Sequence, residues 1–385
     1  MISLWLLWLS HFILDLFTGL WPIYKTMSGI PLVLAGIIAG ISGLIGELSQ
    51  VFFGYIADKG KRKAIALIGL SLTTGMLWIT KTTDPLTIFI LLLFLMIGSG
   101  AYHPAAAGMA ALFSEKKKGT SILFYASGGA FGMGISQLVF IHVFNKCSGS
   151  IFLLAIPLAL IIFMLARHTF PTSCTAKRDF SIRHIASTLW RHKRALMPLY
   201  AAQVLVQTLW LASVFLLPDL LQEKGCSTWL CFGGGHLCIV LGSAAMMIPV
   251  GYICDKLGEK KMVLCFIAIA TCFFYLLLFT PSLSPWMGGL LLTLLGASLG
   301  IVNPTIISWG SRLVPDSPSS VSALLMGCAW CLGNLGPLWG GWISSHITIA
   351  PVTTTLGWMG SLLVFLFLSL SITPQIVSEK TVQEV

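Results

Sequence analysis

The chain has 385 residues, of which 56% are hydrophobic and 9% are charged, and its formal net charge is +10. A water-soluble domain carries about 25% charged residues, so this composition excludes a soluble globular protein and indicates one that lies in a bilayer. The mean hydropathy of +0.91 agrees with that conclusion. The basic excess does not indicate binding to nucleic acid, because it gathers in the connections between apolar runs.

Twelve apolar runs are long enough, at about 20 residues each, to cross a bilayer as helices. The first run has no basic region before it and no small-residue cleavage site, so we expect a retained span rather than a signal peptide. Helices are the expected form because backbone polar groups in hydrocarbon must bond to one another. The predicted spans are residues 2–23, 32–57, 64–80, 86–112, 120–142, 150–166, 196–217, 229–253, 262–280, 286–310, 321–343 and 352–372.

The Lys and Arg residues test both this count and the orientation. With the N-terminus in the cytoplasm, all but four of the 23 fall in cytoplasmic connections, and none falls inside a span. The four exceptions are Lys25, Lys81, Lys146 and Lys224. Because basic loops stay on the cytoplasmic side, we expect a multi-pass protein of the cell (inner or plasma) membrane with both termini in the cytoplasm.

One long polar connection divides the spans into two sets of six. We expect a six-helix bundle at 1–166, a cytoplasmic linker at 167–195, a second six-helix bundle at 196–372 and a cytoplasmic tail at 373–385. The run Gly-Tyr-Ile-x-Asp-Lys occurs in both halves, 197 residues apart, each time between the second and third spans. The sequence therefore predicts an all-α integral membrane fold of two pseudo-symmetric six-helix bundles, related by an axis along the membrane normal.

The two repeats are candidate gate loops at the cytoplasmic surface. An aspartate there can meet a basic side chain or a helix N-terminus in one conformation and lose that contact in another. The alternative interpretation is a tight turn with a solvated carboxylate. The candidate residues are Gly54, Asp58 and Lys59 in the first loop and Gly251, Asp255 and Lys256 in the second.

Three ionisable side chains in the first two spans are candidates for proton coupling. His11 and Asp15 lie four residues apart, so they share a helix face. Glu47 lies among glycines in the second span. Ionisable groups are costly in hydrocarbon and normally face a cavity or a partner, so we expect these three to take up and release protons. The alternative is that their hydrogen bonds only fix the packing of helices.

His103-Pro104 and Asn303-Pro304 occupy corresponding places in the fourth and tenth spans. Proline removes a backbone donor, so Pro104 and Pro304 predict helix kinks. A histidine that merely packs at such a kink is one interpretation, and a substrate ligand is the other. The residues expected to line a substrate cavity are His103, Gln203, Gln207 and Asn303. On this pattern, proton chemistry belongs to the first half and neutral polar recognition to the second.

Taken together, these motifs resemble the major facilitator superfamily over essentially the whole chain, and its fosmidomycin-resistance branch in particular. The resemblance rests on His11-x-x-x-Asp15, Tyr102-His103-Pro104, Gly128-Gly129-x-x-Gly132 and the paired Gly-x-x-x-Asp-Lys loops. It implies a fold of two six-helix bundles and secondary transport. The chain departs from the pattern at Lys61, where a glycine is usual, at Glu259, where a basic residue is usual, and at Ala105, where some relatives carry an acid.

The expected function is secondary active transport, by proton-coupled efflux (antiport) of a drug or small metabolite through alternating access. An uptake symporter or facilitator of the same fold is the nearest alternative. An intramembrane enzyme is disfavoured because the sequence has no His-Glu-x-x-His, Gly-x-Ser-x-Gly or P-loop motif. A non-transporting sensor of the same fold is disfavoured because the ionisable cluster is present.

No cofactor and no metal are expected. Cys328 and Cys331 form a Cys-x-x-Cys pair, but both lie within a predicted span, where helix packing is the default role. The expected partners are a small-molecule substrate, protons and the lipid bilayer, and the expected oligomeric state is a monomer.

Overall fold

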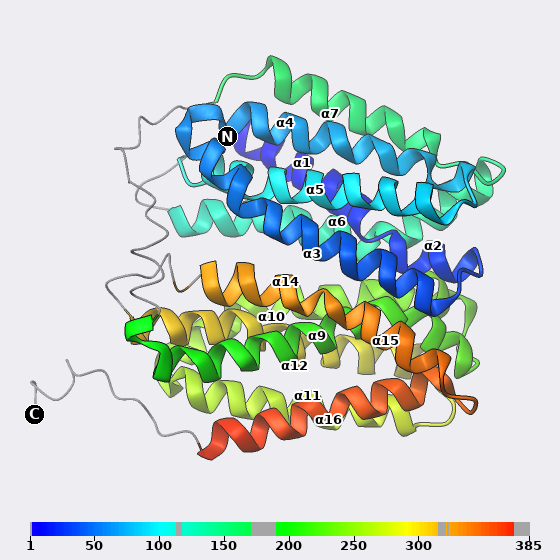
Figure 1. Ribbon diagram of the computed structural model, residues 1–385, viewed down its shortest axis with the longest axis vertical. Helices are drawn as coiled ribbons and strands as arrows, with labels where there is room; N and C mark the ends of the chain where they lie inside the picture. The colour runs from blue at the N-terminus through cyan, green and yellow to red at the C-terminus, as the bar shows by residue number, and fades with distance from the viewer. Residues whose placement is uncertain (1, 113–117, 171–189, 315–320, 322, 373–385) are drawn as a thin grey trace, which may run out of the picture.

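The computed structural model describes residues 2–112, 118–170, 190–314, 321 and 323–372, and the regular structure within them is entirely helical. Figure 1 shows two groups of helices, one from each half of the chain, stacked one above the other. The first group contains α1 (Ile2–Thr18), α2 (Trp21–Met27), α3 (Leu32–Ile56), α4 (Arg62–Thr73), α5 (Pro85–Ala110), α6 (Lys118–Lys146) and α7 (Ala155–Arg167). The second contains α9 (Lys193–Glu223), α10 (Gly235–Leu257), α11 (Glu259–Phe279), α12 (Pro285–Leu313), α14 (Ala329–Gly333), α15 (Leu335–Ser345) and α16 (Pro351–Ile372).

The twelve predicted spans are confirmed as helical segments once short breaks in the described chain are joined. By length and composition alone, eight described stretches can cross a membrane, and one of them, Leu32–Lys81, holds the second and third predicted spans. Two more spans correspond to the shorter apolar helices Phe152–Arg167 and Leu230–Met246. The eleventh is a broken rod made of η5 (Ala323–Cys328), α14 and α15.

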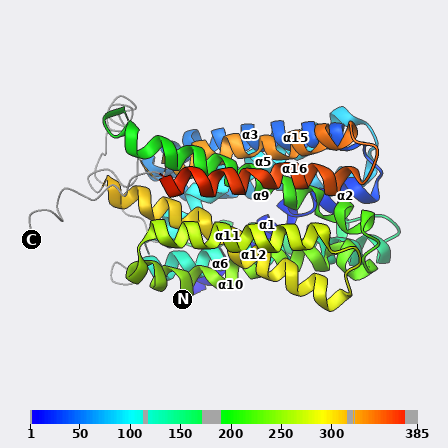
Figure 2. The ribbon, with the colours of Figure 1, turned by 90° about the horizontal axis from the view of Figure 1, so that it is seen from below.

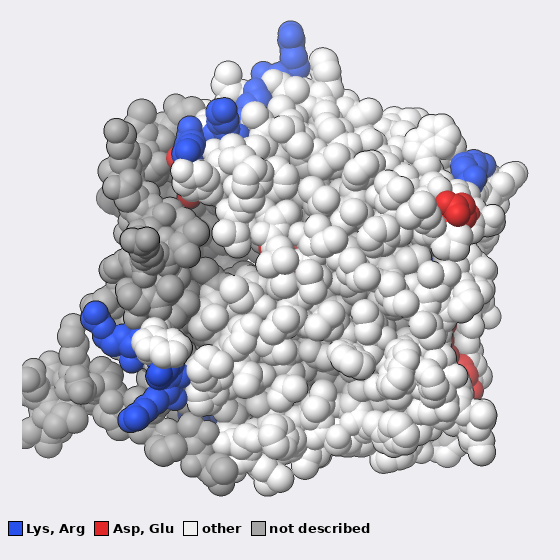
Figure 3. All heavy atoms as spheres, viewed as in Figure 1, with Lys and Arg blue, Asp and Glu red and all other residues white. Residues whose placement is uncertain are grey.

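The molecule has two unlike ends. We call the end where α7 stops and α9 starts the linker end, and the opposite one the far end. The start of α1 and the end of α16 lie on the linker side in Figures 1 and 2. In the view of Figure 3, most of the described Lys and Arg side chains gather at the linker end, beside a broad band with few charges. Such a band is what hydrocarbon requires. The expected linker at 167–195 lies mostly, and the tail at 373–385 wholly, outside the described residues.

Local sequence sets where the long helices start. α5 begins with Pro85 after Asp84, whose carboxylate accepts the Thr87 backbone N–H at 2.8 Å. Hydrogen bonds from the hydroxyl and backbone N–H of Thr87 hold the pKa of Asp84 below its usual range. α12 begins in the same way, with Pro285 after Ser284. Proline at the first turn and an oxygen acceptor before it are the usual start signals of a helix. Pro104 and Pro304 lie inside these two helices, and the kinks expected there remain predictions.

The two halves touch along a crossing of α3 and α15 that glycines make possible. A Cβ atom on Gly36 would collide with the Pro337 carbonyl oxygen, and one on Gly43 would collide with the Asn334 side chain. From the other helix, a Cβ on Gly341 would collide with the Leu32 carbonyl oxygen. Small residues allow this close approach of backbones. Nearer the linker end, α3 instead exposes apolar side chains at Leu48, Val51 and Phe52.

Each repeated loop turns through a glycine in the left-handed region. Gly60 has φ +86° and Gly258 has φ +82°. Residues with a Cβ rarely adopt this conformation, so a glycine is needed at the junction of α3 with α4 and again at that of α10 with α11. The first loop departs from the family pattern at Lys61, but Gly60, one position earlier, supplies the left-handed residue.

Gly36→Ala tests the α3–α15 crossing. Its Cβ would meet a backbone carbonyl that cannot move aside, so we expect the variant to lose about 1–3 kcal/mol of stability and to unfold at a lower temperature in detergent. Gly54→Ala is the matched control on the same helix, because its Cβ would lie 3.5 Å from Pro104, an ordinary contact. Equal melting temperatures for the two variants would contradict the crossing.

Candidate functional site

α1 and α5 bring three ionisable side chains together inside the first half. Asp15 Oδ2 lies 3.2 Å from His11 Nε2, and Asp15 Oδ1 lies 3.6 Å from His103 Nε2. The two imidazoles face each other, with their Nε2 atoms 3.1 Å apart. His11 and Asp15 share a helix face, as the sequence predicts. His103, expected as a separate cavity residue, lies in the same cluster, which we call the triad.

Backbone carbonyls fix the tautomer of both histidines. His11 Nδ1 lies 3.0 Å from the Tyr125 carbonyl oxygen, and His103 Nδ1 lies 2.9 Å from that of Ser99. A carbonyl oxygen only accepts, so each Nδ1 carries the hydrogen and each neutral ring presents a lone pair at Nε2. Two such lone pairs and a carboxylate therefore point at one small space. Three acceptors at these distances repel one another unless a cation lies between them.

α6 closes over the triad at a glycine. A Cβ on Gly129 would collide with Asp15 Oδ2 and His11 Nε2. One turn before it, the Tyr125 ring stacks on the His11 ring with centroids 4.3 Å apart. The side chains of the triad are 8% exposed at His11, 13% at Asp15 and 31% at His103, so the triad is largely shielded but open at His103.

A second polar pair supports α1 against α5 beside the triad. The hydroxyls of Ser10 and Tyr102 are 2.5 Å apart, and Tyr102 also donates to the Leu7 carbonyl oxygen at 3.2 Å. Both side chains are fully buried. The sequence singles out Tyr102 only as part of the Tyr102-His103-Pro104 motif and gives no sign of its contact with Ser10. Their neighbours in sequence, His11 and His103, are held in register by this contact.

Glu47, the third expected proton site, lies apart from the triad. Its carboxylate accepts the side-chain amide of Gln50 at 2.5 Å on the same helix. It follows Gly43 by one turn on α3, so it lies just past the crossing with α15. Nearby, the Cys331 thiol of the second half lies 3.8 Å from the Leu44 carbonyl oxygen. Glu47 therefore lies close to the contact between the two halves.

In the second half the structure joins two of the expected amides and leaves the third alone. The side-chain amide of Gln203 donates to Asn303 Oδ1, which links α9 to α12. Gln207, one turn further along α9, packs against Gly333 of α14. Gln203 is fully buried and Gln207 is 2% exposed. In this conformation the two glutamines thus lie between helices and face no open space.

The repeated loops carry local contacts at the linker end. Asp58 is 73% exposed and forms an ion pair at 3.0 Å with Arg62, the first residue of α4, while Lys59 lies 4.2 Å over the Tyr55 ring. The side chain of Asp255 lies outside what the structure describes, and Lys256 is exposed. Glu259, at the position equivalent to Arg62, is buried and bonds Arg312 at 2.5 Å. The first residue of α4 is therefore a cation and the corresponding first residue of α11 is an anion, and each forms an ion pair.

An ion pair that sequence reasoning missed joins the halves at the far end. Lys25 of α2 bonds Asp219 of α9. In the sequence, Lys25 lies just beyond the first predicted span and Asp219 just beyond the seventh, so neither is expected to be buried between helices. The expectation of no basic residue inside a span is wrong here, because the helical stretch Ile2–Met27 continues through Lys25 and buries it completely. The one available signal was a Lys and an Asp, each within a few residues of an apolar run.

Among the described residues, the triad is also the place where a small cation can be held. The ligand atoms of His11, Asp15 and His103 lie within 4.8 Å of one another. A proton satisfies this arrangement with no other component.

Comparisons with known proteins agree with the fold. The model of the Major Facilitator Superfamily matches residues 3–337. The fosmidomycin resistance protein of Escherichia coli strain K12 is 24% identical over 373 residues, covering 93% of this chain and 91% of that protein. The multidrug resistance protein MdtG of Salmonella typhi is 23% identical over 328 residues, covering 81% and 78%.

Solved structures show the same fold at low identity. The crystal structure of the nucleoside transporter NupG aligns with a TM-score of 0.78 at 14% identity, covering 97% of this chain and 100% of that one. A bacterial homologue of the human lysosomal transporter Spinster, in an inward-facing and unoccupied conformation, aligns with a TM-score of 0.74 at 15% identity, covering 96% of each chain.

A double-mutant cycle tests the amide pair. Gln203→Leu leaves Asn303 Oδ1 without this donor, so we expect a loss of about 1–3 kcal/mol in unfolding free energy, measured by thermal or denaturant unfolding in detergent. Adding Asn303→Leu removes the unpaired acceptor and recovers part of that loss. If the loss of unfolding free energy in the double variant equals the sum of the losses in the two single variants, the two amides do not interact.

Proposed function

The chain belongs to the Major Facilitator Superfamily and is therefore a multi-pass membrane transporter rather than an enzyme; from this premise we propose that it exports a drug or small metabolite in exchange for protons. The halves would rock about the α3–α15 crossing and expose a central site to each side in turn. The linker end, where most of the Lys and Arg side chains visible in Figure 3 gather, faces the cytoplasm in this proposal. The protein works as a monomer in the cell membrane.

The observation that carries the proposal is the convergence of three acceptors in the triad. Neutral His11, neutral His103 and ionised Asp15 repel one another at the observed distances. One added proton turns an acceptor into a donor, so that the other two groups can bind it. Proton binding therefore favours the arrangement in which α1, α5 and α6 lie close together, and proton release favours their separation. Coupling requires a site where proton binding depends on how the helices pack, and the triad is such a site in this proposal.

Glu47 and the repeated loops have supporting roles in this proposal. Glu47 lies one turn past the contact of Gly43 with Asn334, so a change in its protonation would act close to the contact between the halves. The exposed Asp58 would exchange its local Arg62 partner for one in the second half when the linker end closes, and Asp255 would act likewise. Gly54, Lys59, Gly251 and Lys256 complete the gate loops.

Export and substrate class rest on the relatives. One is named for resistance to fosmidomycin and another for multidrug resistance. In the second half, Gln203, Gln207 and Asn303 would supply neutral hydrogen-bonding groups once the helices that bury them move apart, and His103 would contact substrate at the exposed side of the triad. Neutral amides recognise donors and acceptors without demanding one charge.

Flux in reconstituted vesicles tests proton coupling. With fosmidomycin as the first probe and a panel of drugs after it, we expect uphill accumulation in inside-out vesicles under an imposed pH gradient. Asp15→Asn should reduce it to the level of protein-free vesicles, because the triad loses its carboxylate. Asp84→Asn, which alters an exposed helix cap instead, is the matched control and should transport normally.

The outcomes separate the alternatives. Accumulation only in right-side-out vesicles would indicate an uptake symporter. Transport that needs no pH gradient but stops on adding a chelator would assign the triad to a metal ion, and uphill transport by Asp15→Asn would remove the triad from coupling.

Gly129→Ala perturbs the triad without removing any ionisable group. Its Cβ would push Asp15 and His11 away from α6, so we expect gradient-driven transport to fall about tenfold or more, since small misplacements of reacting groups carry large penalties. Gly134→Ala is the control on the same helix, because its Cβ would make only ordinary contacts at 3.5 Å or beyond. Equal transport by the two variants would show that the geometry of the triad does not matter.

A further inference from the structure

We propose that Lys25 and Asp219 form the gate of the far end, and that their bond sets how much of the protein has that end closed. The proposal rests on alternating access as proposed above, but it concerns residues outside the triad. Nothing in the coupling chemistry requires this pair. Its place between the halves is what gives it a function.

The pair is held by a small set of contacts, two of which involve Thr26. The Lys25 ammonium bonds Asp219 Oδ2 and donates to Thr26 Oγ1 at 3.0 Å. Thr26 Oγ1 in turn lies 3.0 Å from Asp219 Oδ1. The ammonium also lies 4.6 Å from the centre of the Phe215 ring, where a cation is attracted to the ring face. Lys25 has no exposed surface, and the Asp219 side chain is 17% exposed.

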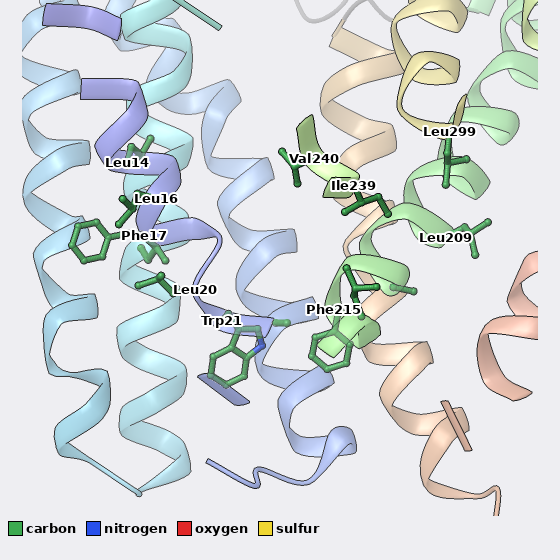
Figure 4. Packing of buried hydrophobic residues seen from close by; sticks show 14 of the residues in the cluster. Leu14, Leu16, Phe17, Leu20, Trp21, Leu209, Phe215, Ile239, Val240 and Leu299 are labelled. Carbon is green, nitrogen blue, oxygen red and sulfur yellow. The ribbon is translucent and has the colours of Figure 1, made fainter. Parts of the chain in front are cut away.

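The partners are divided between the halves. Lys25 and Thr26 belong to α2, whereas Asp219 and Phe215 belong to α9. The contact therefore exists only while the far ends of the two halves touch. Figure 4 shows Trp21 of α2 and Phe215 of α9 among the buried apolar side chains in this part of the molecule. A buried ion pair with an apolar surround must be broken, and both charges hydrated, before the far end can open.

Two other crossings close the same end. The glycines of α3 meet α15, and His236 of α10 bonds the Met133 carbonyl oxygen of α6 at 3.0 Å. The α2–α9 contact is the one of these three that uses opposite charges. Removing one charge of a buried pair destabilises the closed state, whereas removing both does not. Comparing single and double variants therefore measures the role of the pair.

Removing one charge leaves the other buried without its partner in the closed state. Lys25→Met or Asp219→Leu should therefore favour the open far end, where the remaining charge reaches water. When both residues are replaced, no charge is left to be hydrated on opening, and the new apolar side chains are similar in size to the ones they replace. The double variant Lys25→Met/Asp219→Leu should favour the closed far end even more than the original pair does. Lys25→Asp/Asp219→Lys reverses the charges and should restore the original balance.

The experiment measures accessibility of the far end. A thiol reporter, Trp21→Cys, is placed in a cysteine-free version of the full chain whose folding is checked by size-exclusion chromatography and melting temperature. In vesicles with the far end outside, the rate of labelling by a membrane-impermeant maleimide reports opening. We expect labelling at least about fivefold faster in each single variant, the lower limit of typical coupling between sites. The double variant should label more slowly than the parent, and the charge reversal close to the parent rate.

Lys224→Met is the matched control. Lys224 lies at the same end, but it donates to the Leu278 carbonyl oxygen within its own half, so its labelling rate should not change. Parental labelling rates in both single variants, or faster labelling in the double variant, would overturn the gate. Labelling requires neither substrate nor a proton gradient. A failed flux assay with the expected labelling pattern would therefore count against proton coupling and leave the gate intact.

Discussion

A polar side chain in hydrocarbon has no water to bind, so its partner must come from another part of the chain. This constraint shapes the interior of the protein. His11 and Asp15 of α1 contact His103 of α5, and Gln203 of α9 bonds Asn303 of α12. Each contact fixes a pair of helices in register and depends on their staying together. A polar group that would be costly to bury on an isolated helix therefore stabilises the one packing of helices in which it has a partner.

The two halves use this constraint in different ways. The first concentrates ionisable groups at α1 and α5, where a proton changes what the groups can accept or donate. The second uses amides, whose bonds do not change with pH in the physiological range. At the linker end the asymmetry takes another form, since Arg62 and Glu259 occupy equivalent positions with opposite charge. A repeated scaffold has thus acquired distinct chemistry in each copy.

Much of the fold could be predicted from sequence because its signals are local. Apolar run length predicts the helices, and the i, i+4 spacing of His11 and Asp15 predicts their contact. The position of His103 beside them could not be predicted, because it depends on the register of α1 against α5, which Ser10 and Tyr102 help to set. Lys25 was misplaced for a related reason. Charge counting assigns a lysine near the end of a span to a loop, and only the folded chain reveals a carboxylate 194 residues away that stabilises it inside.

The first helical rod joins the triad to the Lys25–Asp219 pair. α1 carries Asp15, and after a short break at Gly19 and Leu20 the chain continues as α2, which carries Lys25. At about 1.5 Å per helical residue, ten residues separate them by roughly 15 Å. If proton binding at one place shifts the equilibrium at the other, thermodynamic linkage makes the effect reciprocal. The affinity of Asp15 for a proton is then partly a property of the distant Lys25–Asp219 bond, so the far end of the protein helps to set the pH at which its interior responds.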